Sequence, residues 1–532
     1  MTRLERHGAA VVSFRPVGTV TGRLDEPSGT AQSNVFEPAR RALLLFGAVI
    51  AFISAGLLVY SQTMAFVWDE GFHILAAQLI DRGKVPYIDF CFPQTPLNAY
   101  WNAAWMAVFG ESWHVTHALA ALAASAAVFL IAEYVFRRFP VPRWRLASAI
   151  VVAFFVGLNT TVFQFGTITQ AYGIGLLLTV AAFRVAITAV DRKGLLLPFS
   201  TGLLAGTAAG CSLLTAPMTP VLVLWMFVCN RAGHRWAKFA ASLAGAALPF
   251  APVLWLFAKA PRQVFFNIVQ YQAIFRRVKW NGATPHDVDV LSAWLVDAQS
   301  LLLGLLAVAG VVFISRASNW DRARRREFYL CAWLAGASTL YIATAHPTFQ
   351  RYFIFVIPFA GVLASAGLYW AGSRLHSPHH PLWPSLIVSA LIALSLGRAL
   401  FDDRDSTTWK DYQEISKKID EVTPRGGLVY ADELVYFLTR RPPPPGMEFS
   451  YSHKLELPPA QEALYHLVSE SELNAQVKAG KYATVQSCND DRIDALKLPD
   501  LFPNKTDIKD CSIFWGKMKT AAADAAEKTP SK

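Results

Sequence analysis

Long apolar segments recur throughout the first four hundred residues, separated by shorter polar stretches. Most approach the roughly twenty residues that an α-helix needs to cross a bilayer, and none shows the two-residue alternation of a barrel strand. The segments lie near residues 42–60, 113–136, 146–164, 171–190, 195–214, 217–230, 237–258, 291–314, 328–345, 352–371 and 383–400. The pattern predicts a polytopic α-helical membrane protein with about eleven transmembrane helices.

The polar stretches between these segments differ in charge. Stretches 137–145 and 316–326 are rich in Arg, whereas 160–170 and 214–219 contain neither Arg nor Lys. Cytoplasmic loops of membrane proteins carry an excess of these two residue types. We therefore predict a protein of the bacterial inner membrane with a cytoplasmic N-terminus and a periplasmic C-terminal domain. An odd number of spans agrees with this orientation.

Polarity divides the chain into regions. Residues 1–41 are predicted to form a disordered cytoplasmic tail, and residues 42–401 a transmembrane domain whose first outer loop, residues 61–111, is unusually long. Residues 402–518 are predicted to form a small periplasmic α/β domain, and residues 519–532 a second disordered tail. Within the α/β domain we expect helices at 409–422, 432–439, 460–469 and 471–479 and strands at 427–431, 482–486 and 511–515.

Composition supports a membrane protein. Hydrophobic residues make up 54% of the chain and charged residues 16%, whereas soluble domains are about 25% charged. The net charge of +11 is uneven: residues 401–532 hold 18 Lys and Arg against 22 Asp and Glu, which leaves +15 for residues 1–400. This excess consists mostly of Arg flanking the apolar segments, so we expect contact with membrane lipids and no nucleic-acid partner.

Cysteine positions give one further structural prediction. Cys488 and Cys511 share the C-terminal domain, each beside a predicted strand. In an oxidising compartment such a pair is expected to form a disulfide. No CxxC motif and no His cluster has the spacing of a metal site, so neither a metal ion nor another cofactor is predicted.

The long first loop contains an acidic pair. Only twelve acidic residues occur between positions 42 and 400, and two of them are adjacent, Asp69 and Glu70. A carboxylate close to the hydrocarbon boundary is costly and marks a candidate functional site. The alternative is that Asp69 caps the helix that follows it, a role compatible with catalysis. We call residues 61–111 the acidic loop.

The residues that follow the pair have a recognisable order: Trp68-Asp69-Glu70, a helix, Gly83, Pro86-Tyr87, Asp89 and Pro96-Leu97. This order resembles the first outer loop of the GT-C glycosyltransferases, above all the bacterial branch of the superfamily of protein mannosyltransferases and lipid A aminoarabinose transferases. The resemblance covers the membrane topology and the outer C-terminal domain.

This resemblance implies an enzyme that takes a sugar from a polyprenyl-phosphate donor and transfers it to a hydroxyl group of a lipid, glycan or protein. Asp69 stands where the family has its general base. A hydroxyl group is a poor nucleophile, and a carboxylate that removes its proton assists attack on the anomeric carbon, with inversion. Glu70 would position the acceptor or modulate Asp69, since neighbouring like charges raise one pKa; it could equally face solvent.

Two groups of residues are candidates for binding the donor phosphate. The first lies in a basic stretch, 259–290, that breaks the charge rule for outer loops, and the second precedes a late apolar segment and is similar to the corresponding family segment. The candidates are Arg276, Arg277 and Lys279 in the first group and His346, Arg351 and Tyr352 in the second. The alternatives are contact of the basic stretch with anionic lipid, an interfacial anchor for Arg351 and a helix-end residue for His346.

Residues proposed to position the acceptor or the loops are His73, Tyr87, Asp89, Gln94 and Gln170. Gln170 is also a departure from the family, because many relatives have an acid at this place. The departure weakens the case for a second catalytic carboxylate or a metal ion. A monophosphate leaving group does not require a metal in principle.

Three other functions are compatible with the same sequence features. The chain could be a transporter or flippase of lipid-linked substrates, a catalytically inactive binding or assembly protein, or a ligase that uses a pyrophosphate-linked donor. A transporter would be expected to show charged or broken helices at the membrane midplane in paired halves of the chain, and the sequence shows no such pairing.

Overall fold

The computed structural model describes residues 40–63, 67–318, 320–375 and 381–516. The predicted tails at 1–41 and 519–532 lie outside these ranges, except that Arg40 and Arg41 begin the first helix. From Arg40 onward the chain forms one compact unit. The predicted domain boundary at residue 402 therefore stays a prediction. The helix that begins at Leu382 ends at Asp402.

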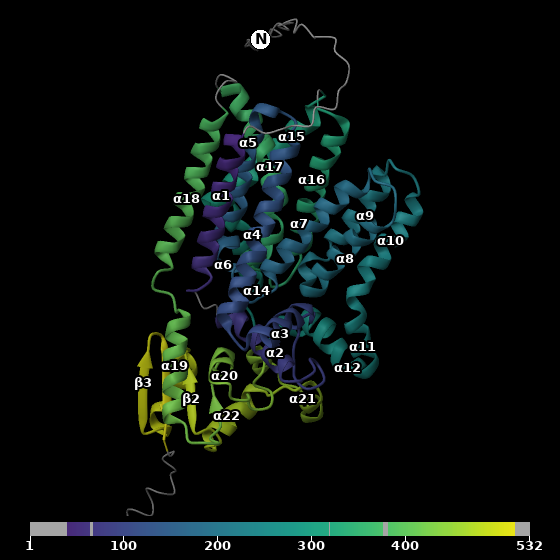
Figure 1. Cartoon of the computed structure of the whole chain (residues 1–532). Coiled ribbons are helices and arrows are strands. Elements are labelled where there is room, and N and C mark those ends of the chain that lie inside the picture. Colours follow the sequence, from purple (N-terminus) through teal and green to yellow (C-terminus); the bar gives the residue numbers. More distant parts are fainter. Residues whose placement is uncertain (1–39, 64–66, 319, 376–380, 517–532) are drawn as a thin grey trace, which may run out of the picture. The chain divides into compact units, whose positions relative to one another are not determined.

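The first part of the chain is helical, and each predicted apolar segment overlaps a helix (Figure 1). The helices that do so are α1 (Arg40–Tyr60), α4 (Trp113–Arg138), α5 (Arg145–Gly157), α6 (Thr160–Phe165), α7 (Tyr172–Ala189), α8 (Leu196–Cys211), α9 (Met218–Cys229), α10 (Arg235–Ala247), α11 (Ala251–Lys259), α14 (Ala283–Val296), α15 (Ala298–Arg316), α16 (Arg322–Ala343), α17 (Ile357–Leu375) and α18 (Leu382–Asp402).

Six helical stretches of the described residues are long and apolar enough to cross a membrane: α1, α4, α7, the joined α10 and α11, α15 and α18. Helix α8 and the stretch containing α9 are apolar but shorter. The structure thus confirms a largely helical chain with membrane-length segments. The total of about eleven spans stays a prediction.

Some segment boundaries differ from those predicted, for local reasons. The apolar run near 291–314 is divided at Asp297, which ends α14 (Ala283–Val296) and caps α15 by accepting a hydrogen bond from the Ser300 N–H. The run near 352–371 begins with a 3₁₀ helix, η6 (Gln350–Phe355), before α17 starts.

Helices α15 and α17 cross at very close range. A side-chain carbon at Gly310 would collide with the Leu363 carbonyl, and one at Gly367 would collide with the Leu306 carbonyl. Small residues that allow backbones to approach are typical of helix contacts in membranes, where van der Waals packing replaces the hydrophobic effect. The segment before α17 is η6, which carries Arg351 and Tyr352.

The acidic loop forms two helices, α2 (Val67–Asp81), which is the helix expected after the acidic pair, and α3 (Leu97–Phe109). Helix α2 is followed by Gly83 at a φ of 86°, a conformation that favours glycine. Leu75, Ala76 and Ala77 of α2 are buried. The helix packs against α3 and against α20 (Glu433–Thr439) of the C-terminal region, which is how the region after residue 402 reaches the acidic loop.

The C-terminal region, residues 402–516, is a small α/β unit (Figure 1). Its strands have the spatial order β1-β2-β4-β3, in which β1 and β2 are parallel and the other pairs are antiparallel. The edge strand β3 was not predicted. The elements are α19 (Trp409–Val422), β1 (Val429–Tyr430), α20, η7 (Ser450–Lys454), α21 (Pro459–Tyr465), α22 (Glu470–Lys478), β2 (Thr484–Ser487), α23 (Asp490–Leu496), α24 (Leu498–Leu501), β3 (Asn504–Ile508) and β4 (Cys511–Trp515).

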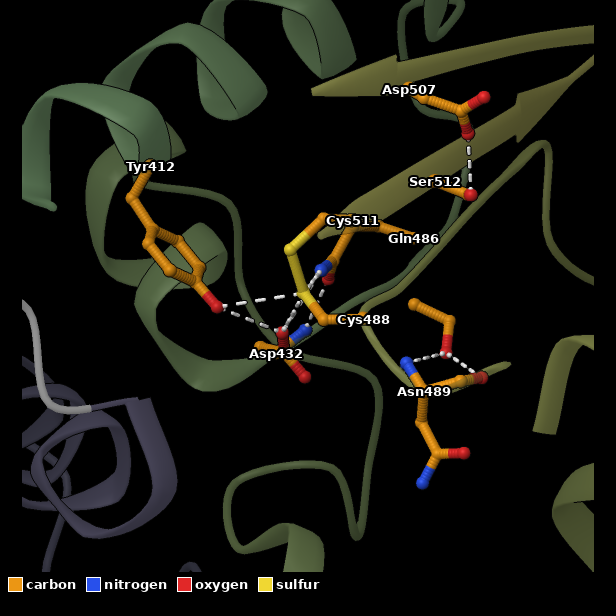
Figure 2. Close-up of a disulfide and its surroundings, with 9 residues drawn as sticks. Tyr412, Asp432, Gln486, Cys488, Asn489, Asp507, Cys511 and Ser512 are labelled. Atoms are coloured by element: carbon orange, nitrogen blue, oxygen red, sulfur yellow. Dashed lines mark hydrogen bonds between the residues drawn. A yellow bond between two sulfur atoms is a disulfide. The ribbon is translucent and has the colours of Figure 1, made fainter. Parts of the chain in front are cut away.

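The predicted disulfide between Cys488 and Cys511 is present and joins the end of β2 to the start of β4 (Figure 2). Next to it, the carboxylate of Asp432 accepts hydrogen bonds from Gln486 Nε2 at 2.9 Å and from the Tyr412 hydroxyl at 3.3 Å. Burial raises the pKa of Asp432, and these hydrogen bonds oppose that effect. The polar cluster is therefore satisfied within the C-terminal region.

Aromatic and backbone contacts hold the C-terminal region against the acidic loop and the start of α4. The Trp409 ring stacks on the Trp113 ring with 4.5 Å between centroids, and Gln78 of α2 donates a hydrogen bond to the Phe437 carbonyl at 3.0 Å. A side-chain carbon at Gly71 would lie 3.1 Å from the Cβ of Glu433, so α2 and α20 approach as closely as a glycine allows. These contacts place η7 beside the N-terminal turn of α2.

Candidate active site

A cavity of about 760 Å³ lies where α2, η6 and the C-terminal region meet. Its wall contains Asp69 and His73 from α2, Arg351 and Tyr352 from η6, and Tyr451 from η7. Residues far apart in the sequence thus surround one space. The volume falls within the roughly 300–1,000 Å³ typical of sites for small molecules.

Asp69 lies in the first turn of α2, where a carboxylate is favoured by the positive end of the helix dipole. Its Oδ2 forms an ion pair with the guanidinium of Arg351, and its Oδ1 accepts a hydrogen bond from the Tyr451 hydroxyl at 3.2 Å. The side chain keeps 18% of its surface exposed, and that of Arg351 keeps 14%. Asp69 is thus a fixed carboxylate at the cavity wall.

Glu70 is not among the residues that line this cavity, and its side chain is fully buried. Its Oε1 forms an ion pair with His117 Nε2 and accepts a hydrogen bond from the Thr169 N–H at 2.8 Å. The other ring nitrogen of His117 lies 2.6 Å from the Ser61 carbonyl. Burial raises the pKa of Glu70, but the charge and hydrogen bond of His117 and the Thr169 hydrogen bond outweigh it, so the net pKa is lowered.

The segment before Gln170 is held by several helices at once. The Thr169 carbonyl accepts hydrogen bonds from Asn98 at 3.1 Å and from Asn102 at 3.0 Å, both from α3. The hydroxyls of Thr169 and Thr116 lie 2.9 Å apart. Together with the Glu70 contact, these bonds fix the loop that places Gln170 at the cavity wall.

His73 follows Asp69 by one helical turn and also lines the cavity. Burial lowers its pKa to about 4, against the opposing charges of Asp69 and Glu70. The imidazole is therefore neutral near pH 7. Within the described part of the chain its Nδ1 has no hydrogen-bond partner, while its ring packs on Phe72 and Phe92.

Cationic side chains also line the cavity. Arg276 donates a hydrogen bond to the Tyr352 hydroxyl, and the Arg351 guanidinium lies 4.2 Å from the centre of the Phe349 ring. Lys279 also lines the cavity but pairs with Glu456 at 3.2 Å and with Glu470 at 3.8 Å. Arg277 lines the cavity and donates a hydrogen bond to the Ala273 carbonyl at 3.5 Å.

His346 lines the cavity and precedes η6 in the sequence. Its Nδ1 pairs with Asp287 Oδ2, and Asp287 Oδ1 accepts a hydrogen bond from the Thr348 N–H at 2.7 Å. Asp287 thereby joins α14 to the turn that leads into η6. The side chain of His346 is thus held in place by the Asp287 carboxylate.

Tyr87 and Asp89 are absent from the wall. The Tyr87 hydroxyl donates to the Gln94 carbonyl at 2.6 Å, and Asp89 Oδ2 accepts from the Val85 N–H at 2.7 Å. Both residues hold the turn that leads to Gln94, which does line the cavity. Their predicted role as loop-positioning residues agrees with these contacts.

The structure therefore brings most predicted site residues to one cavity and keeps three outside it. Those at the wall are Asp69, His73, Gln94, Gln170, Arg276, Arg277, Lys279, His346, Arg351 and Tyr352. Those outside it are Glu70, Tyr87 and Asp89. Among the described residues no group of three or more His, Cys, Asp or Glu side chains is arranged to hold a metal ion.

Sequence reasoning missed the residues that the C-terminal region contributes, Phe449, Tyr451 and Lys454, and the buried partner of Glu70, His117. The first group lies in a short segment with no motif. His117 had a detectable signal, because a histidine inside an apolar segment requires a polar partner.

No protein-family model matches the sequence, and no curated protein matches it. Two solved structures of ArnT from Cupriavidus metallidurans are similar in fold. The structure bound to undecaprenyl phosphate has a TM-score of 0.60 at 14% identity, covering 91% of this chain and 99% of that chain. The apo structure has a TM-score of 0.61 at 15% identity, covering 90% of this chain and 98% of that chain.

The chain shares the fold of these two ArnT structures. The resemblance predicted from the acidic loop is thus confirmed at the level of the fold, over 91% of the chain. At this level of identity the similarity establishes the fold, and the activity has to follow from the residues of the cavity.

Proposed function

We propose that the chain is a membrane glycosyltransferase that moves a sugar from a polyprenyl-phosphate donor to a hydroxyl group of an acceptor. One observation carries the proposal. Among the described residues that line the cavity, Asp69 is the one carboxylate, and it shares the cavity with the cations Arg276, Arg277, Lys279, Arg351 and Lys454. A base among cations suits the removal of a proton from an alcohol while a phosphate leaves.

Asp69 is the proposed general base. An acceptor hydroxyl beside its carboxylate gives up its proton as its oxygen bonds to the anomeric carbon of the sugar. The bond between that carbon and the phosphate oxygen breaks, and polyprenyl phosphate leaves with the bonding electrons. Attack opposite the leaving group inverts the anomeric centre. A positioned carboxylate contributes about 10²–10⁴ to such a rate.

Arg276 and Tyr352 are the proposed phosphate ligands, with Arg351 beside them. Preorganised cations and hydroxyl donors stabilise the charge that develops on a leaving phosphate. Arg277 is available for a second contact. Lys279 is the weaker candidate, because Glu456 and Glu470 already share its charge.

Glu70 is proposed as a positioning residue rather than as a second catalytic group. Its carboxylate holds the Thr169 backbone and, through it, the loop that carries Gln170. Gln170 at the wall is then a hydrogen-bonding group for a sugar or an acceptor. The absence of an acid at position 170 fits a mechanism in which Asp69 acts alone as the base.

The fold supports a polyprenyl phosphate as the carrier, since one ArnT structure contains undecaprenyl phosphate and shares its architecture over 91% of this chain. The charge pattern of the polar stretches supports a cavity that opens to the periplasm of an inner membrane, with the N-terminus in the cytoplasm. Flippase activity gains no support from the cavity, which holds one base and several cations at a single wall.

Transfer assays on substituted protein test the proposal. Purified full-length protein is incubated with labelled polyprenyl-phosphate sugar and membrane extract. Asp69→Asn keeps the shape of the side chain and removes the base, and a loss of at least about 10²-fold is expected. The matched control is Asp81→Asn, an exposed position on the same helix outside the cavity. Transfer by Asp69→Asn at the wild-type rate would exclude the base assignment.

A binding measurement tests the donor site separately. The affinity for undecaprenyl phosphate is measured for wild type, Arg276→Gln and the control Arg262→Gln, whose side chain is exposed and outside the cavity. About tenfold weaker binding is expected for Arg276→Gln alone, because it loses one charged contact to the phosphate. Equal affinity for all three proteins would contradict the proposed phosphate site.

A further inference from the structure

The C-terminal region forms part of the cavity wall. Phe449, Tyr451 and Lys454, from η7 and the residue before it, line the same space as Asp69 and Arg351. The Tyr451 hydroxyl of the C-terminal region donates a hydrogen bond to the candidate base, Asp69. A domain that only covered the active site would make no such contact.

Segment η7 is fixed on both sides. The Ser450 N–H donates to Glu433 Oε1 at 2.7 Å, and Glu433 lies at the close contact between α20 and Gly71 of α2. The Phe449 ring packs edge-on against Phe72 of α2, with 5.0 Å between centroids. The position of Tyr451 is therefore set by α2, the same helix that carries Asp69.

Both oxygens of the Asp69 carboxylate have a partner in the structure. Arg351 binds Oδ2 and Tyr451 donates to Oδ1, so the plane of the carboxylate is held from two sides. A carboxylate oxygen can accept about two hydrogen bonds, which leaves capacity on Oδ1 for an incoming hydroxyl. Burial, followed by the charge of Asp69, raises the pKa of the Tyr451 phenol, so it remains a hydrogen-bond donor at neutral and alkaline pH.

We propose that Tyr451 is a positioning residue for Asp69, and that the C-terminal region is therefore part of the catalytic apparatus rather than a cover or a docking module alone. The proposal rests on the proposed function, because it assigns Tyr451 a task in proton transfer to Asp69. Arg351 sets the charge environment of the carboxylate, and Tyr451 sets the direction in which Oδ1 offers its remaining lone pair.

The test compares the wild type with Tyr451→Phe, which removes one hydroxyl and keeps the ring. We expect kcat for transfer to fall about tenfold, in line with a lost hydrogen bond to a charged group. The KM for the donor and the affinity for undecaprenyl phosphate are expected to stay within twofold of wild type. A residue that merely stabilised the fold would lower the thermal midpoint and would not separate kcat from KM.

The matched control is Tyr465→Phe in the same region. The Tyr465 ring stacks on Phe266 with 4.1 Å between centroids but lies outside the cavity, so its kcat should equal that of wild type. Tyr451→Leu is a second variant without the hydroxyl, for use if Tyr451→Phe does not fold, and the same separation of kcat from KM is expected.

The outcomes separate this inference from the proposed function. If Asp69→Asn is inactive while Tyr451→Phe has the wild-type kcat, the inference is overturned and the proposed function stands. If Tyr451→Phe weakens donor binding at unchanged kcat, Tyr451 is a donor ligand and the inference is again overturned. If Asp69→Asn transfers sugar at the wild-type rate, the base assignment itself fails.

Discussion

The carboxylate of Asp69 and the guanidinium of Arg351 form an ion pair across 282 positions of the sequence. The pair links the acidic loop to η6 and thereby joins the two segments that the family resemblance had singled out separately. Arg351 had also been interpreted as an interfacial anchor, but its side chain is largely buried and turned toward the cavity. The pair makes Arg351 the first residue to substitute after Asp69.

Arg351→Gln is expected to reduce transfer about 100-fold, because it leaves a partly buried carboxylate without its charge partner and removes a cation from the proposed phosphate site. Arg351→Lys should recover only part of this loss, since an ammonium cannot reproduce the planar fork of a guanidinium. Initial rates of the three proteins, with donor binding measured in parallel, check this. Full activity of Arg351→Gln would show that the pair has no part in the reaction.

Glu70 and His117 form a fully buried pair, and breaking it should destabilise the protein by about 3 kcal/mol. Glu70→Gln and His117→Gln are each expected to lower the thermal midpoint. The double variant should lose less than the sum of the two, because the residues share one interaction. Additive losses would indicate that the pair is not coupled.

The same pair predicts a pH dependence. The folded-state pKa of Glu70 is lowered from 4.5, so its contribution to stability is present above pH 4.5 and is lost as the pH falls through the lowered value. The wild-type thermal midpoint should therefore fall below that pH more steeply than the midpoint of Glu70→Gln. Parallel melting curves from pH 7 to pH 3 make the comparison.

Glu433 behaves in the opposite way. Burial raises its pKa to about 7 despite the hydrogen bond from Ser450, so the folded state holds its proton more tightly than the unfolded chain does. Its protonated form stabilises the fold below pH 4.5, and this contribution is lost as the pH rises through 7. Glu433→Gln should therefore raise the stability by about 2 kcal/mol at pH 8 and change it little at pH 4. A lower midpoint at pH 8 would contradict this.

The disulfide closes a short loop, since its cysteines are 23 positions apart. By the loop-entropy relation, its removal should cost the C-terminal region about 3 kcal/mol. Reduction of the wild type or the double substitution Cys488→Ser and Cys511→Ser should lower the thermal midpoint of this region. A reductant should have no further effect on the double variant. Alkylation of Cys488 or Cys511 in native, unreduced protein would show that the bond does not form.

The local pattern of apolar and polar residues was sufficient to predict most of the helices and strands. A helix of apolar residues satisfies its own backbone, so each predicted apolar segment between residues 42 and 400 overlaps a helix of the structure. The ends were less certain wherever a single polar residue intervened, as Asp297 does before α15. The strands β2 and β4 and the disulfide between them followed from equally local signals, while the exposed edge strand β3 did not.

The site was predictable in its composition but not in its arrangement. Asp69, Arg276, Arg351 and Tyr352 were singled out by residue type and by family resemblance, and the cavity contains all of them. Glu70 was grouped with Asp69 because the two are adjacent. Successive residues of a helix point about 100° apart, however, and the structure turns Glu70 toward His117 and away from the cavity.

The helical membrane class, the acidic loop and the carboxylate at position 69 could be predicted from the amino-acid sequence, because bilayer insertion and helix formation depend on residues that are close together in the chain. The groups that contact this carboxylate are known only from the folded structure. Tyr451 reaches Asp69 across 382 positions, and such a contact depends on the packing of α2 against α20, which no short stretch of sequence encodes.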